Sequence, residues 1–210
     1  LTLTSYADVT SLMELRDLLR RRWQVPITYT DLIVKAVAAA LRQHPLLNST
    51  LMGEEIVLQN DINIGVAVAL PQGLIVPVVR GADEIALPEL HRGLHDLAER
   101  ARQERLLVDE VTGGTFTVTN LGMYGVEAFT PIINPPEVAI LGVGGISPHL
   151  VLANGQVAER SRMALSLTID HRIVDGAPGA AYLQSLVQLL EHPALIFAEG
   201  PGASESEGAT

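Results

Sequence analysis

The order of helix-like and strand-like segments is the feature that most constrains this chain. Apolar residues recur at helical spacing in four segments, and short β-like runs stand between those segments along the whole sequence. No internal repeat accompanies this alternation. Interspersed helices and strands are typical of a single α/β domain in which helices flank a mixed β-sheet. We therefore expect one domain over residues 1–199, followed by a disordered tail at 200–210 that is rich in Gly, Ser and Glu.

Each predicted helix has its own start or stop signal. Ser11 and Glu14 fit a capping box, and Pro88 occupies the position that proline takes in the first turn of a helix. The second and the last predicted helices stop before His44 and His192, each of which precedes a proline. The predicted helices are 11–23, 30–43, 88–106 and 178–191.

The predicted strands are short and lie between turn signals. Pro77 lies inside one of them and indicates an edge strand or a bulge, and Asn154-Gly155 indicates a tight hairpin turn. The Gly- and Pro-rich loop 120–136 is long, and loops of that length are often functional. The predicted strands are 49–52, 55–58, 62–70, 74–79, 115–119, 137–143, 150–152, 156–159 and 161–170.

Composition excludes several classes of function. The 14 Lys and Arg against 24 Asp and Glu give a net charge of −10, which argues against nucleic acid as a partner. No uncharged apolar run approaches the roughly 20 residues of a membrane helix, so we expect no membrane contact. The chain has no cysteine, which removes disulfides, thiolate metal ligands and a cysteine nucleophile. The absence of disulfides fits an intracellular protein.

The apolar content bears on assembly. Hydrophobic residues make up 48% of this acidic chain, which favours an oligomer that hides apolar surface, although an aliphatic, β-rich core has the same composition. The sequence starts at Leu1 without a methionine or a signal-like segment. We therefore expect it to be a piece of a longer protein.

His171 is the histidine best placed for chemistry. It follows an apolar strand and precedes a helix, where strand-to-loop junctions present side chains. Asp175, four residues later, can fold back to fix the imidazole tautomer, or it can simply cap the helix beside an incidental histidine. A metal site here is the weakest interpretation, because no third ligand is suggested. The other histidines are interpreted as structural or surface residues: His44, His91, His95, His149 and His192.

Five motifs in the same order resemble one known family. The stretch 166–177, Ser-Leu-Thr-Ile-Asp-His-Arg-Ile-Val-Asp-Gly-Ala, is similar to the catalytic signature of dihydrolipoamide acyltransferases, the E2 components of 2-oxo acid dehydrogenase complexes. Four further stretches resemble other motifs of that family, and the similarity covers about residues 3–198. These stretches are 8–16, 72–78, 114–122 and 133–142.

The resemblance implies a fold like that of chloramphenicol acetyltransferase, with a mixed sheet flanked by helices. It also implies a homotrimer with active sites between subunits, which in this family stacks into cores of 24 or 60 subunits. Coenzyme A would enter each site from one side, and the dihydrolipoyl arm of a separate lipoyl domain from the other. The only lysine, Lys35, lies in a predicted helix, so the lipoyl domain and the domain that binds the E1 and E3 components are expected upstream of Leu1. The expected location is the cytoplasm in a prokaryote or the mitochondrial matrix in a eukaryote.

The resemblance also implies roles for residues. His171 matches the general base that takes the proton of the coenzyme A thiol, a group that is mostly protonated at pH 7. Thr119 stands where relatives usually carry serine, and its hydroxyl would stabilise the tetrahedral intermediate. Asp175 matches a position with a structural role, in which it would pair with Arg16. The positions that match coenzyme A contacts are Arg16, Thr28, Asn120, Gly144 and Ile146.

Other functions remain open at this point. The chain could be a non-catalytic core or scaffold subunit of the same fold, although His171 and Thr119 argue against that. It could also be a free-standing acyltransferase that acts on an unrelated acceptor. Val174 to Ala177, followed by Gly179, favours the acetyl type, with branched-chain and acetoin types as alternatives. No metal is expected.

Overall fold

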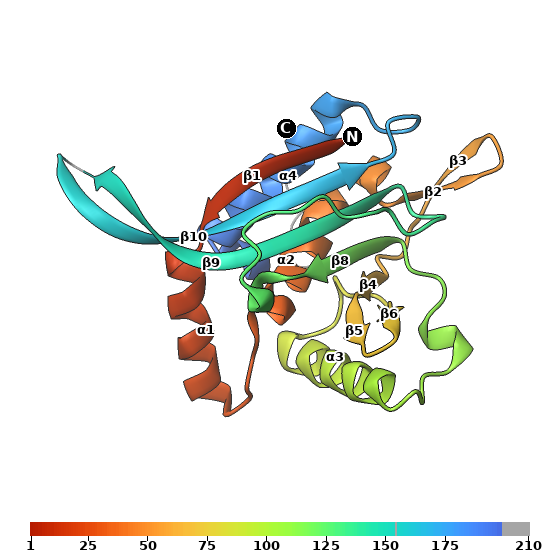
Figure 1. The fold of residues 1–210 in the computed structure, drawn as a ribbon, viewed down its shortest axis with the longest axis horizontal. Coiled ribbons are helices and arrows are strands. Elements are labelled where there is room, and N and C mark those ends of the chain that lie inside the picture. The colour runs from red at the N-terminus through yellow and green to blue at the C-terminus, as the bar shows by residue number, and fades with distance from the viewer. Residues whose placement is uncertain (154, 199–210) are drawn as a thin grey trace, which may run out of the picture.

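The structure is a computed structural model, and it describes residues 1–153 and 155–198 (Figure 1). The predicted tail at 200–210 lies outside the described residues, and so does Asn154 of the predicted hairpin turn. Within the described ranges, no helix is long and apolar enough to cross a membrane.

A six-stranded sheet forms the centre of the fold, and it is mixed, as predicted. Its strand order is β1-β10-β9-β8-β4-β7, and every pairing is antiparallel except those of β8 with β9 and with β4. Pro77 directly precedes the edge strand β7, which confirms the expectation of an edge. The strands are β1 (Thr2–Asp8), β4 (Ile64–Val66), β7 (Val78–Val79), β8 (Phe116–Asn120), β9 (Ala139–Ala153) and β10 (Gln156–Ile169).

Two small antiparallel sheets complete the β-structure. The predicted strand 62–70 is wrong as one element, because the chain leaves the main sheet at Ala67, whose N–H donates to the carbonyl of Val118. The predicted run 74–79 is also divided, because β6 ends at Ile75 in a small sheet and β7 begins at Val78, after Pro77, in the main sheet. The small sheets pair β2 (Ser49–Met52) with β3 (Glu55–Leu58), and β5 (Val68–Leu70) with β6 (Gly73–Ile75).

The predicted helices are all present, but their caps differ from expectation. The capping box at Ser11 is wrong, because the helix begins at Thr10, whose N–H and hydroxyl both donate to the carboxylate of Asp8. A capping box that sequence reasoning missed joins Thr28 and Asp31 at the start of the second helix. The helices are α1 (Thr10–Trp23), α2 (Tyr29–Gln43), α3 (Leu87–Arg102), α4 (Gly176–Glu191) and the short α5 (Leu195–Ala198), with 3-10 turns at Pro45–Leu47, Val108–Glu110 and Gly122–Tyr124.

Helix α2 lies at the centre of the packing. Its residues are buried from Asp31 to Leu41 apart from Lys35, and it packs against α4 and α3. Lys35 donates from Nζ to the carbonyls of Ala82, Asp83 and Ile85, and burial lowers its pKa. The only lysine therefore holds the segment before α3 in place.

The hairpin of β9 and β10 is longer than predicted. Four predicted strands merge into two strands of 15 and 14 residues. Among the described residues, 148–161 form strand pairs only with each other, because β1 pairs with β10 from Arg162 onward and β8 pairs with β9 only as far as Val143. Figure 1 shows this outer part projecting past α1.

A buried carboxyl group anchors the loop that leads into β9. Glu137 is 5% exposed, and it accepts hydrogen bonds from the hydroxyl of Thr117 at 2.6 Å and the amide of Asn134 at 3.3 Å. Burial raises the pKa of Glu137 to about 7, against the opposing effect of these two hydrogen bonds. The folded chain therefore binds the carboxyl proton more tightly than the unfolded chain does.

We expect Glu137→Gln to stabilise the protein at alkaline pH. Because the folded pKa is raised, the contribution of Glu137 to stability is fully present below the unfolded pKa and is lost as pH rises through the folded value. The difference in unfolding free energy between variant and parent should grow by about 2 kcal/mol in favour of the variant from pH 5 to pH 8. Denaturant titrations at one chain concentration measure it, with the exposed Glu54→Gln as control. An equal difference at both pH values would contradict the assignment.

Candidate active site

His171 lies at the junction where the sequence places it. It follows β10 and stands before α4, and its imidazole Nδ1 is 3.8 Å from a carboxylate oxygen of Asp175. That distance suits an ion pair but is too long for a hydrogen bond. Asp175 occupies the N-cap position of α4, yet its side chain makes no capping bond. Both side chains are exposed, His171 at 57% and Asp175 at 83%, so this end of the site is open to an approaching molecule.

An ion pair that sequence reasoning did not single out braces the loop. Asp170 accepts hydrogen bonds from the Arg172 backbone N–H and from its guanidinium, with contacts of 2.5 to 3.1 Å. These hydrogen bonds to Arg172 lower the pKa of Asp170. The two residues flank His171 on either side in the sequence. Their pairing therefore fixes the backbone that carries the imidazole, and the Asp-His-Arg order was the signal for it.

Thr119 lies in the last part of β8 and lines a cavity of about 460 Å³. Among residues 1–153 and 155–198, its hydroxyl has no hydrogen-bond partner, so it is available to a bound molecule. Thr117, two residues earlier and on the same face of the strand, instead donates its hydroxyl to Glu137. Apolar residues of β5, β6 and α3 form much of the wall, among them Val68, Leu74 and Leu94.

A second cavity of about 330 Å³ adjoins the first. Thr28, Thr30 and Asn120 line both cavities, and the side-chain amide of Asn120 donates to the hydroxyl of Thr30 at 3.2 Å. Gly144 and Ile146 of β9 line the second cavity only. The structure therefore brings together four of the positions at which coenzyme A contacts were predicted.

Gly144 is required by a close approach of two backbones. A Cβ at this position would lie 1.8 Å from the carbonyl oxygen of Glu127, which is far inside contact distance. Gly145 next to it donates its N–H to Val126. The segment after β8 therefore packs directly on β9 and closes one side of the second cavity.

Arg16 lies beside this region, but not near Asp175. Its guanidinium donates to the carbonyl of Ile27 at 3.2 Å and stacks over the ring of Tyr29 at 4.3 Å. Arg16 and Asp175 therefore do not pair within one chain, and a pairing between two chains stays a prediction. The reason is topological, because α1 and the loop before α4 lie at opposite ends of the molecule (Figure 1).

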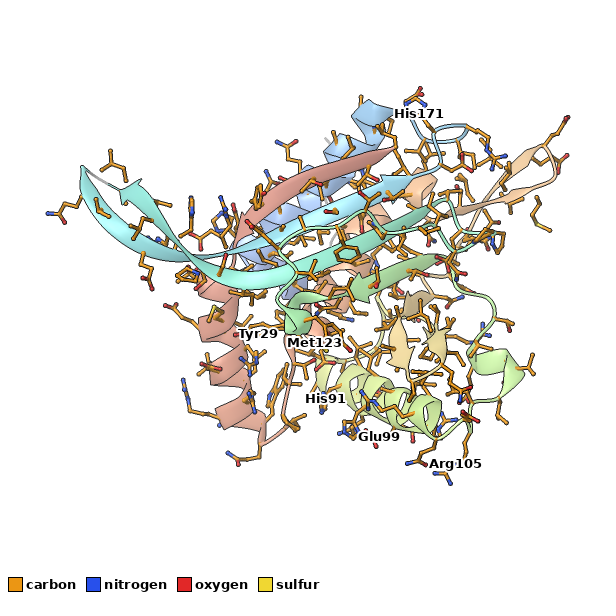
Figure 2. All side chains as sticks on the ribbon, viewed as in Figure 1. Tyr29, His91, Glu99, Arg105, Met123 and His171 are labelled. Atoms are coloured by element: carbon orange, nitrogen blue, oxygen red, sulfur yellow. The ribbon has the colours of Figure 1, made fainter. Side chains whose placement is uncertain are left out.

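The two halves of the predicted site are also far apart. Thr119 of β8 pairs with Gly142 of β9, and Gly142 pairs with Ser166 of β10. From Ser166, β10 continues for three residues to its end at Ile169, and His171 follows after that end. That end lies about 10 Å along the sheet and about 10 Å across it from Thr119. Figure 2 shows His171 at one end of the molecule, with Met123 and His91, which line the Thr119 cavity, in another part.

The family described as 2-oxoacid dehydrogenases acyltransferase (catalytic domain) matches residues 1–198. The chain belongs to this family. The chain is a catalytic domain of a 2-oxoacid dehydrogenase acyltransferase (E2), as the sequence motifs predicted.

Relatives of this acyltransferase domain are named for the transfer of different acyl groups. The acetyltransferase component of the acetoin cleaving system of Bacillus subtilis is 42% identical over 201 residues, 94% of this chain and 50% of the relative. The succinyltransferase component of the 2-oxoglutarate dehydrogenase complex of Escherichia coli K12 is 34% identical over 201 residues, again 94% and 50%. The chain spans about half the length of these relatives.

Solved structures agree with the fold of the family. The dihydrolipoamide acetyltransferase of Azotobacter vinelandii has a TM-score of 0.89 and 37% identity, with 94% of this chain and 83% of that chain covered. Chloramphenicol acetyltransferase, at 15% identity, has a TM-score of 0.58 over 90% of this chain and 87% of its own. The predicted fold class is confirmed.

One buried pair in this acyltransferase domain was missed. His91 was interpreted as a structural or surface histidine, but its Nδ1 bonds the carboxylate of Asp31 at 2.8 Å, and both side chains line the Thr119 cavity. No local signal in the sequence links residues 60 positions apart. Within the described residues, no three His, Asp or Glu side chains gather as a metal site would require.

Proposed function

We propose that this domain transfers an acyl group between dihydrolipoamide and coenzyme A, at active sites shared between copies of the chain. The observation that carries the proposal is the separation of His171 from Thr119. A general base must lie within hydrogen-bond reach of the proton that it removes. Since the two groups cannot reach one thioester within a chain, a second copy supplies one of them.

The chemistry follows from the two side chains. In the direction that makes acyl-coenzyme A, His171 takes the proton of the coenzyme A thiol, and the thiolate attacks the carbonyl carbon of acyl-dihydrolipoamide. The carbonyl oxygen becomes an oxyanion, to which the Thr119 hydroxyl donates a hydrogen bond. When the carbonyl re-forms, the dihydrolipoamide sulfur leaves and takes the proton back from the His171 imidazolium. The reaction needs no metal or redox step.

The adjoining cavities supply room for an arm that ends in a thiol. The second cavity is lined by Thr28, Asn120, Gly144 and Ile146. The guanidinium of Arg16 stacks on the ring of Tyr29, which also lines this cavity. The aliphatic and amide groups of coenzyme A match such a wall of apolar and small polar residues. We assign coenzyme A contacts to these positions.

Asp175 and Arg16 take complementary places in this arrangement. The carboxylate of Asp175 is exposed next to His171, and Arg16 lies next to the cavities. If a neighbouring copy brings its His171 to the Thr119 cavity, its Asp175 approaches the same region as Arg16. The predicted ion pair then forms between two chains rather than within one.

The acetyl group stays the predicted acyl group. Relatives of comparable identity are named acetyltransferases and succinyltransferases, so the choice is an experimental one. Initial rates with acetyl-, succinyl- and isobutyryl-coenzyme A rank the three groups. A scaffold subunit would give no transfer with any of them, and a free-standing acyltransferase would not use dihydrolipoamide.

Assembly is proposed as a homotrimer that stacks into a core of 24 or 60 subunits. A solved relative with a TM-score of 0.89 is the cubic core of a pyruvate dehydrogenase multienzyme complex. Partners proposed for the complete protein are a lipoyl domain and the E1 and E3 components.

Mixed oligomers test the shared site directly. We expect chains with His171→Ala and chains with Thr119→Val to be nearly inactive alone. The first variant removes the general base from every site, and the second removes the oxyanion donor from every site. In co-assembled oligomers with equal amounts of both chains, about a quarter of the sites pair an intact His171 with an intact Thr119, so about a quarter of the parental activity should return. Transfer between acetyl-coenzyme A and dihydrolipoamide measures it.

Sedimentation at micromolar concentration is the control, and the parent should sediment as a trimer or larger. A fully active monomer of 22.5 kDa would contradict the proposal, as would co-assembled oligomers that stay inactive.

A further inference from the structure

The most unusual polar group outside the two catalytic side chains is the buried pair of Asp31 and His91. Asp31 is 2% exposed and His91 7% exposed, although both are ionisable. One carboxylate oxygen of Asp31 accepts hydrogen bonds from the backbone N–H of Thr28 at 2.7 Å and from His91 Nδ1 at 2.8 Å. The pair thus connects the start of α2 with the first turns of α3.

The pairing leaves one nitrogen of the imidazole facing the cavity. Among residues 1–153 and 155–198, no group forms a hydrogen bond with Nε2 of His91, and the residue lines the 460 Å³ cavity together with Thr119. Nε2 is also absent from the fully enclosed polar atoms that lack a partner, so the atom is reachable from the cavity. A buried side chain with an unused polar atom at a cavity wall requires a ligand or water as its partner.

Asp31 decides what this nitrogen can do. An ionised carboxylate only accepts hydrogen bonds, so the hydrogen of the neutral imidazole stays on Nδ1. Nε2 then carries a lone pair and accepts. The wall around it is mostly apolar, with Leu94 and Ala98 on the same helix. The cavity therefore suits an aliphatic chain that carries one hydrogen-bond donor.

The charges around the cavity do not favour an anion. Asp31 is negative, and Arg102 is paired with Glu99 at 2.7 Å. The titratable groups that line the cavity with His91 are Asp31, His95, Glu99, Arg102 and Tyr124. A neutral donor such as a secondary amide N–H fits this set better than a carboxylate does.

We propose that His91 is a positioning residue, whose Nε2 accepts a hydrogen bond from an amide N–H of a thiol-bearing arm bound in the Thr119 cavity. The proposal rests on the acyl transfer proposed above and extends it. Both substrates of that reaction have such an arm, the dihydrolipoyl amide and the pantetheine part of coenzyme A. The hydrogen bond holds the arm at a fixed depth and so sets its sulfur relative to Thr119.

The substitution His91→Asn tests the role. The asparagine amide nitrogen lies close to where Nδ1 was, so the bond to Asp31 is kept, while the distal acceptor is removed. We expect a rise of about tenfold in KM for one of the two arms, with kcat within about twofold of the parent and the thermal midpoint unchanged. Steady-state kinetics with dihydrolipoamide and acetyl-coenzyme A, and in reverse with coenzyme A, show which arm is affected.

Two controls separate the possible outcomes. His192→Asn, at the exposed end of α4, is the matched control and should change neither constant. If the lipoyl arm is the one bound, the parent should have a higher KM for the methyl ester of dihydrolipoic acid, which has no amide N–H, than for dihydrolipoamide. In His91→Asn the KM values for the amide and the ester should be equal. Should His91→Asn fail to fold, His91→Phe takes its place, because it keeps a ring in the same space without a distal acceptor and should raise the same KM. His91→Gln, whose side-chain amide oxygen can accept in place of Nε2, should keep that KM near the parent's.

Unchanged KM values for both arms in folded His91→Asn would overturn the proposal. So would equal losses in kcat and in the thermal midpoint with no selective effect on KM, since these indicate that His91 only supports Asp31. An inactive parent would instead refute the acyl transfer itself, which keeps the two failures distinct.

Discussion

His171→Ala is expected to lower kcat by about 10²- to 10⁴-fold, the usual contribution of a positioned general base. The imidazole is the base assigned to the thiol proton, and without it the thiol must lose that proton to water. The fold should persist, because His171 is 57% exposed and its loop is held by the ion pair of Asp170 with Arg172. The measurement is the initial rate of acyl transfer at saturating concentrations of both substrates.

Arg172→Ala makes a useful companion to this variant. It removes the brace but leaves the imidazole, so it should lower the rate by less than His171→Ala does. Circular dichroism and sedimentation show whether both variants keep the parental structure and assembly. A folded, assembled His171→Ala chain with a near-parental rate would refute the assignment of the base.

Thr119→Val is expected to reduce kcat by about 10²- to 10³-fold, as the loss of one donor to an oxyanion typically does. Valine keeps the branched shape of threonine, and the Thr119 hydroxyl has no hydrogen-bond partner among the described residues, so stability should not change. Affinity for coenzyme A should also change little. The rate and the thermal midpoint are measured on the same preparations.

Two controls lie close by. Thr119→Ser keeps the hydroxyl and should stay within about tenfold of the parent, with less restriction of its rotamer. Thr117→Val, on the same face of β8, removes the hydrogen bond to Glu137 and should cost about 1 kcal/mol of stability rather than rate. If Thr119→Val lowers stability and leaves the rate unchanged, the backbone amides near Gly144 become the next candidates for the donor.

The sequence was sufficient for the elements whose signals are local. Helical spacing and prolines placed the helices to within a few residues, and Pro77 indicated the sheet edge. Local signals failed where a contact distant in the sequence decides the conformation. The run 62–70 alternates like one strand, but the chain pairs with β8 only over Ile64–Val66, and from Val68 onward it pairs with β6 in a separate small sheet. The start of α1 differs from the predicted one for a local reason, because Thr10 donates to the carboxylate of Asp8, the last residue of β1, and the helix begins at Thr10 rather than at Ser11.

In the candidate site too, residues within local motifs could be predicted, and residues defined by distant contacts could not. His171 and Thr119 could be found from motifs, because each lies within a stretch that resembles the family. The pair of Asp31 and His91 could not, because it joins two helices across 60 residues and neither residue lies in a motif. The pairing of Arg16 with Asp175 was transferred from the resemblance without a chain assignment. The fold of one copy then shows that the two residues are at opposite ends.

The outer part of the β9–β10 hairpin gives one continuous strand two very different local stabilities. Between Arg162 and Thr168, β10 is hydrogen-bonded to β1 on one side and β9 on the other, so its amide protons should exchange with solvent only on global unfolding. Over residues 156–160 the same strand pairs, within the described part of the chain, with β9 alone, and a two-stranded ribbon is marginally stable in water. Amides there should exchange through local opening. Because a surface that covers the ribbon would slow this opening, the exchange rates of these amides report whether the ribbon is covered.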